Sequence, residues 1–242
     1  MDSKRYLIVN ADDFGQSFGV NRGVVTAHER GILTSASLMV RWPATAEAAG
    51  YARAHRKLSV GIHLDFGESV FRNGDWVRLY RVVEEEDADA VEAEIAHQIA
   101  AFHDLMGRSP THIDSHQHAH RRDPARSTVV RIAGEFGVPV RNCTPGIQYT
   151  GRFYGQDGRG ISCPECVSVD GLIQILQELP PGVTELGCHP AESEDLNAMY
   201  SAERQRELST LCDPRVRQAL DSLQIELRSF ADFGTVPTTK VS

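Results

Sequence analysis

The most constraining feature of this 242-residue chain is an alternation of strand-like and helix-like segments through most of its length. Short apolar runs are followed by segments in which apolar residues recur every three or four positions. Consecutive parallel strands need a crossover of a dozen or more residues, and a helix is the usual crossover. The alternation therefore predicts a parallel sheet covered by helices.

The expected elements can be placed by residue number. Strands are expected at residues 6–10, 34–40, 58–64, 111–115, 138–141, 184–188 and 225–229. Helices are expected at residues 20–30, 44–55, 88–106, 127–136, 170–179, 202–211 and 216–222. The stretches 11–15, 65–87 and 144–165 are expected to be loops, and the last two are long enough to suggest a functional role.

About seven strand–helix units fit a single-domain α/β fold of the (β/α) barrel type, either complete, distorted or with fewer than eight units. An open, doubly wound sheet is the alternative. The glycine-rich turn of dinucleotide-binding sheets is absent, because the first strand leads into Asp12 and Asp13. We expect one domain over residues 1–234 and a disordered tail at residues 235–242.

Charge and composition disfavour several classes of protein. The formal net charge of −8 disfavours a nucleic-acid-binding protein, which usually has a basic face, and disfavours docking to anionic lipid. No apolar run is long enough to insert into a membrane, and residues 1–10 lack the pattern of a signal peptide, so we expect a cytoplasmic protein. Cys163 and Cys166 lack the second pair that a zinc knuckle needs, and we expect two free thiols in a loop.

Reactive side chains stand at the ends of several predicted strands. Asp12 and Asp13 follow the first strand, His63 ends the third, His116 follows the fourth and His189 follows a later one. In parallel α/β folds the carboxyl ends of the strands share one face, and active sites are built there. We therefore expect these residues to converge although they lie far apart in the sequence.

Some of these residues also have an ordinary structural explanation. Asp12 and Asp13 could cap the next helix, and His63 could be a buried core residue. The functional interpretation of the acid pair is that one carboxylate binds a metal while the other takes a proton from water. His189 would then be a candidate general acid, because imidazole gains and loses a proton near neutral pH.

The segment 111–120 is harder to explain by structure alone, because it contains four histidines and an aspartate. If the strand continues through it, His112, Asp114 and His116 lie on one face. Two histidines and one aspartate suit one divalent ion, Zn²⁺ or a similar transition metal, whereas an Mg²⁺ site would need more carboxylates. Zinc is favoured, and Mg²⁺ is the alternative.

Five blocks of the chain resemble the YdjC-like carbohydrate deacetylase family. They are LIVNADDFG at 7–15, GILTS at 31–35, GIHL at 61–64, PTHIDSHQH at 110–118 and CHP at 188–190. The blocks occur in order over most of the chain, and the first and fourth are the most specific. The resemblance implies a divalent-metal N-deacetylase that acts on an N-acetylated carbohydrate, on a (β/α) barrel-like fold, as a homodimer.

The resemblance also implies roles for individual residues. Asp13, His63 and His116 match the metal ligands, Asp12 matches the general base and His189 matches the general acid. Less specific matches and neighbours are possible substrate contacts or supports for the ligands: His112, Asp114, His118, Arg141 and Tyr154.

Several questions stay open at this point. His118 could replace His116 as ligand if the strand ends early, and Arg141 could either support the base or contact substrate. Residues 65–68 and the loop at 149–166 depart from the chitooligosaccharide enzymes of the family, so the particular sugar does not carry over. A metal-dependent phosphoesterase or another amidohydrolase is the alternative enzyme, and a non-catalytic sugar-binding protein is a further alternative.

Overall fold

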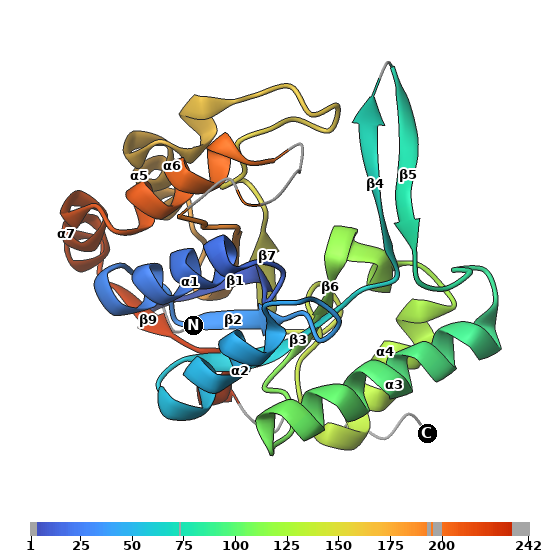
Figure 1. Ribbon diagram of the computed structural model, residues 1–242. Coiled ribbons are helices and arrows are strands. Elements are labelled where there is room, and N and C mark those ends of the chain that lie inside the picture. The colour runs from blue at the N-terminus through green and yellow to red at the C-terminus, as the bar shows by residue number, and fades with distance from the viewer. Residues whose placement is uncertain (1–3, 73, 193–194, 196–199, 234–242) are drawn as a thin grey trace.

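The computed structural model describes residues 4–72, 74–192, 195 and 200–233 (Figure 1). The described elements follow one another as β1 (Arg5–Phe14), α1 (Phe18–Arg30), β2 (Ser35–Leu38), α2 (Thr45–Ala54), β3 (Ser59–Leu64), β4 (Gly67–Arg72), β5 (Asp75–Arg81), α3 (Ala88–Met106), β6 (Ile113–Ser115), η1 (His116–Arg121), α4 (Ala125–Phe136), β7 (Ile147–Thr150), η2 (Pro164–Val167), α5 (Val169–Gln177), β8 (Gly182–Cys188), α6 (Ala202–Leu211), α7 (Pro214–Ser222), β9 (Ile225–Arg228) and η3 (Phe230–Phe233). The tail expected at 235–242 lies outside the described residues.

Strand β1 is the centre of a 7-stranded sheet in the order β6-β3-β2-β1-β8-β7, with β9 also paired to β1. All the recorded pairings in this sheet are parallel. One edge of β1 pairs with β8, and the other edge is divided between β9 near Arg5 and β2 near Asn10. The carboxyl ends of the strands therefore meet at one face, as the alternation of the sequence predicts.

The sheet is curled into a half-barrel within a single α/β domain. Beyond β6, Val140 makes one parallel bridge to Ile113, and the backbone N–H of Arg141 donates to the carbonyl of Ile113 (3.1 Å). The strand expected at 138–141 is thus reduced to a bridge, because Pro139 has no N–H to donate to a ladder. The prediction of a barrel-like fold with fewer than eight strand–helix units is confirmed. The alternative prediction, an open, doubly wound sheet, is wrong.

The core lies between the sheet and the helices, which surround it in Figure 1. Leu7, Ile8 and Val9 of β1 are fully buried, as is typical of a parallel strand covered on both faces. Helix α3 has the predicted bounds and buries the apolar positions of the predicted stripe: Val91, Ile95, Ile99, Phe102 and Met106. It ends at Gly107, whose left-handed φ of 63° favours glycine.

Three predicted loops contain regular structure. The stretch 65–87 forms the antiparallel hairpin β4–β5, which projects from the body of the molecule (Figure 1). Its charged, exposed side chains hide the strand pattern, and the useful signal was the Asn-Gly turn sequence that ends at Gly74. The stretch 144–165 contains β7 and the start of η2, and β1 continues through Asp12 and Asp13 to Phe14.

The prediction of two free thiols at Cys163 and Cys166 is wrong, because the two residues form a disulfide. Turn η2 brings their Cα atoms to 5.4 Å, which is within the range that a disulfide can bridge. Among the described helices, none combines the length and the apolar character needed to cross a bilayer.

Candidate active site

A cavity of about 340 Å³ lies at the carboxyl ends of the strands. Its lining comes from β1, β3, the hairpin, η1, the segment 151–160, the end of β8 and α6. Seven of the ten residues singled out from the sequence line it: Asp12, Asp13, His63, His116, His118, Tyr154 and His189. Arg141, Asp114 and His112 are buried beneath it and do not line it.

The end of β1 has an unusual backbone conformation at Asp13, whose φ is 63°. A non-glycine residue with positive φ is uncommon, although aspartate tolerates it better than most residues. The next turn is closed by Gln16, whose N–H donates to the Asp13 carbonyl (3.0 Å). Gly15 follows with φ 97°, and a Cβ there would lie 2.9 Å from the carbonyl of Met39. The chain therefore turns sharply at the residue whose carboxylate enters the cavity.

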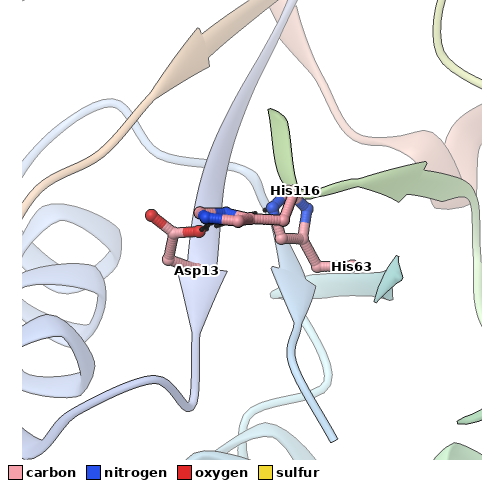
Figure 2. Close-up of side chains that lie close together, drawn as sticks. All are labelled: Asp13, His63 and His116. Atoms are coloured by element: carbon pink, nitrogen blue, oxygen red, sulfur yellow. Dashed lines mark hydrogen bonds and ion pairs between the residues drawn. The ribbon is translucent and has the colours of Figure 1, made fainter. Parts of the chain in front are cut away.

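Asp13, His63 and His116 form the cluster of donors in this cavity (Figure 2). Asp13 Oδ1 lies 3.0 Å from His116 Nδ1 and 3.4 Å from His63 Nε2. One ligand atom from each of the three residues lies within 4.8 Å of the others. The two imidazole rings face the carboxylate from β3 and from the start of η1, as Figure 2 shows.

The chemistry of this cluster fits a divalent ion. His63 Nδ1 lies 2.7 Å from Asp114 Oδ1, so a proton on Nδ1 donates to this carboxylate, and Nε2 faces Asp13. Such a carboxylate–imidazole pair is the usual orienting contact behind a metal ligand. Although burial alone would raise it, the pKa of Asp13 is held well below its usual range by Arg204 and His116. The cluster thus offers one ionised carboxylate and two imidazoles.

A second set of three donors, Asp12, His63 and Asp114, is equally compact. Both of its carboxylates are already bound to the buried guanidinium of Arg141. A divalent ion in this second set would lie next to a cation that holds both carboxylates, which disfavours it. In the first set Arg204 holds only Oδ2 of Asp13, and Oδ1 faces the two imidazoles. Asp13, His63 and His116 are therefore the better candidate ligands.

Arg141 holds Asp12 through two hydrogen bonds, donating from Nη1 to Oδ2 and from Nη2 to Oδ1, each at 2.7 Å. Its Nε donates to Glu185 (2.7 Å), and Nη2 lies 2.8 Å from Asp114 Oδ2. Although burial alone would raise it, the pKa of Asp12 is lowered by Arg141. Of the two alternatives left open by the sequence, the geometry favours support of Asp12 over contact with substrate.

His189 lies on the other side of Asp12, with Nε2 3.8 Å from Asp12 Oδ2. Its Nδ1 lies 3.9 Å from Glu207 Oε1, and its ring is flanked edge-on by Tyr154 and Tyr200. Burial lowers the pKa of His189 to about 4 and raises the pKa of Glu207 to about 8. The imidazole is therefore neutral near pH 7 in the substrate-free site.

The remaining histidines of the segment 111–120 have different surroundings. His118 faces Tyr149 across 3.5 Å in the cavity wall and does not belong to any of the three donor clusters found among the described residues. His112 stacks on Phe230 with ring centroids 3.8 Å apart and contacts Ser37. His120 is buried against Ser115 and the carbonyl of Arg141. The geometry thus favours His116 over His118 as the ligand from this segment.

Three charged residues of the site were missed from the sequence: Glu185, Arg204 and Glu207. Arg204 and Glu207 belong to α6, a helix with few apolar residues that would ordinarily be assigned to the surface. A signal was available, because Glu203, Arg204 and Glu207 occupy one helical face where apolar residues would be expected. Glu185 lies within a buried strand and gave no such signal.

Comparisons with known proteins agree with this architecture. The family model described as YdjC-like protein matches residues 6–222. A carbohydrate deacetylase of Brevibacillus brevis is 32% identical over 263 residues, which cover 94% of this chain and 99% of the relative. A structure from Enterococcus faecalis, described as a cellobiose-phosphate cleavage protein, superposes with a TM-score of 0.76 at 24% identity, over 96% of this chain and all (100%) of the other.

A more distant structure extends the comparison of the fold. The family 4 carbohydrate esterase from Streptomyces lividans, in complex with acetate, superposes with a TM-score of 0.55 at 14% identity. The superposition covers 97% of each chain. At this identity the likeness concerns the fold, and it places the curled sheet among the folds of carbohydrate esterases.

Proposed function

Since the chain belongs to the YdjC-like family, we propose that it is a divalent-metal-dependent N-deacetylase that hydrolyses the acetamide of an N-acetylated carbohydrate. The expectation of a hydrolase acting on carbon–nitrogen bonds agrees with the name of its curated relatives, carbohydrate deacetylase. The observation that carries the proposal is the arrangement of Asp13, His63 and His116 beside Asp12 in one cavity.

Each residue of the site has a role in this reaction. Asp13, His63 and His116 would hold the ion, which supplies a Lewis acid when it is bound. Asp12, ionised and fixed by Arg141, takes a proton from the water that attacks the acetamide carbonyl. The carbon–nitrogen bond then breaks, and the proton that Asp12 took from water reaches the departing amine nitrogen through His189, whose Nε2 lies 3.8 Å from Asp12 Oδ2. The products are acetate and an amino sugar.

The reaction is tested by acetate release from a panel of N-acetylated mono- and oligosaccharides, measured with zinc and with magnesium. The proposal expects acetate from at least one sugar and no phosphate from a parallel panel of phosphate esters. Phosphate release without acetate release would favour the phosphoesterase alternative. A protein that binds these sugars but releases neither product would favour a non-catalytic sugar-binding role.

The identity of the metal, the oligomeric state, the cellular location and the range of partners stay predictions. Zinc is the favoured ion because two of the three proposed ligands are histidines, with Mg²⁺ as the alternative. The homodimer, the cytoplasmic location and the absence of nucleic-acid partners rest on the sequence arguments alone.

A further inference from the structure

The side chain of Arg204 has two satisfied nitrogens and one unsatisfied nitrogen. Nη2 donates to Asp13 Oδ2 (2.6 Å), and Nε donates to the backbone carbonyl of Tyr200 (3.0 Å). Nη1 is buried and has no hydrogen-bond partner among the described residues. The side chain is 7% exposed and belongs to the lining of the cavity. The residue that carries this unsatisfied donor therefore belongs to the site described above.

An unsatisfied donor on a buried cation is energetically costly. A buried polar group without a partner costs about 1–3 kcal/mol, and more when the group is charged. The guanidinium cannot easily rotate to satisfy Nη1, because Asp13 and Tyr200 already hold the other two nitrogens of the same rigid plane. An acceptor brought into the cavity by a ligand would satisfy it.

We propose that Arg204 Nη1 is the protein donor to the acyl oxygen of the substrate, which makes Arg204 a catalytic residue. This inference rests on the proposed deacetylation. When water adds to the carbonyl carbon, the carbon–oxygen π electrons move onto the oxygen, and a fixed cation stabilises the resulting negative charge. The charge returns to re-form the carbonyl as the carbon–nitrogen bond breaks, and the amine nitrogen takes a proton.

The acyl oxygen fits this donor better than another part of the sugar does. Nη1 belongs to the same guanidinium that holds Asp13, a proposed ligand at the reacting centre. A hydroxyl or an anionic substituent remote from the acetamide would lie away from Asp13. The acyl oxygen is also the atom that gains charge during the attack, so a donor there strengthens in the transition state.

Two substitutions and one matched control separate this role from a structural one. Arg204→Met removes all three nitrogen donors, and Arg204→Lys keeps a cation for Asp13 without the planar pair of Nη donors. Arg206→Met changes an exposed arginine on the same helix, α6. Thermal unfolding and metal content are measured for every variant. If Arg204→Met unfolds or loses its metal, the wild type is compared with Arg204→Lys instead.

The first measurement is binding of acetate, the product that carries the acyl oxygen, by calorimetry with and without zinc. We expect at least about tenfold weaker binding to Arg204→Met and Arg204→Lys than to the wild type, and no change in Arg206→Met. Wild-type affinity in both Arg204 variants would overturn the proposal, and so would a wild type that does not bind acetate. This result does not depend on turnover of any sugar.

The second measurement is steady-state kinetics on a sugar that the wild type hydrolyses. Loss of one oxyanion donor typically lowers kcat about 10²–10³-fold, and we expect this in Arg204→Met with little change in KM. Arg204→Lys with normal metal content and normal kcat would overturn the proposal. A wild type inactive on every N-acetylated sugar would instead contradict the proposed function, while the acetate measurement still decides the role of Arg204.

Discussion

At the scale of single residues, Arg141 is a buried cation shared by three carboxylates: Asp12, Asp114 and Glu185. These carboxylates come from β1, β6 and β8, so the cation joins three strands beneath the cavity. Removing one partner of such a buried network typically costs about 3–5 kcal/mol, because the others are left without compensation. Arg141 thus contributes both to the stability of the fold and to the ionisation of the proposed base.

We predict that Arg141→Met raises the pKa of Asp12, because the cation that lowers this pKa is lost. A base must be ionised to act, so the acid limb of the kcat/KM profile should move to higher pH. Arg141→Lys, which keeps a charge but only one point of contact, should show a smaller shift. An unchanged acid limb in a folded Arg141→Met protein would mean that Asp12 is not the group that titrates.

His112 predicts a pH dependence of stability. Burial lowers its pKa to about 3, against about 6.5 in the unfolded chain, so only the unfolded state takes up a proton between these values. Stability from this residue is therefore present above pH 6.5 and is lost as the pH falls, by about 2 kcal/mol at pH 5.

The measurement is urea unfolding of wild type and His112→Asn at pH 7, 6 and 5, both with a chelator. The difference between the two proteins isolates His112 from the other buried histidines. We expect the free energy of unfolding to fall more steeply in the wild type. If the free energy of unfolding falls equally in the two proteins as the pH is lowered, His112 is not held neutral by the fold.

The residues at the strand ends were predictable because one rule locates them. A parallel sheet brings Asp12, Asp13 and His63 to the same face wherever they stand in the sequence. Arg204 and Glu207 were not predictable in this way, because they reach the site from a helix. The spacing of Glu203, Arg204 and Glu207 indicates a buried face of α6, but it does not indicate that this face reaches the ends of the strands.

At the scale of elements, the β4–β5 hairpin supplies the outer wall of the cavity. Trp76 of β5 lines the cavity while 55% of its surface is exposed, and it contacts Phe71 edge-on. An exposed indole in the lining of the proposed sugar site offers an apolar face to a pyranose ring. The helix α3, with its regular stripe, was predictable from the sequence. The hairpin was not, because its exposed strands carry little apolar alternation.

We predict that Trp76→Ala raises KM for an N-acetylated oligosaccharide about two- to thirteenfold, the equivalent of one lost aromatic contact of roughly 0.5–1.5 kcal/mol. The expected kcat is unchanged, because the indole is not among the groups around Asp13. Val77→Ala is the matched control, since Val77 is exposed on the same strand and does not line the cavity. Equal KM values for Trp76→Ala and Val77→Ala would exclude the indole from substrate binding.

At the scale of the whole molecule, the half-barrel explains why the site forms a single unit. The curl of the sheet lets Arg141, which follows the bridge at Val140, reach Asp12 on β1 and Glu185 on β8. A flat sheet would keep that segment, at the β6 end, far from β8 in the strand order. The alternation of the sequence predicted the parallel sheet. It did not determine the curl, which depends on packing between distant segments.

The two adjacent carboxylates have different roles in the proposed reaction, and Asp12→Asn separates these roles. The measurement is acetate release together with bound metal per chain, for wild type, Asp12→Asn and Asp13→Asn. We predict that Asp12→Asn keeps its metal and loses turnover by about 10²–10⁴-fold, the usual contribution of a general base, while Asp13→Asn loses both. Full turnover in Asp12→Asn would show that Asp12 is not the base. Loss of metal from Asp12→Asn would show that Asp12 belongs to the metal site.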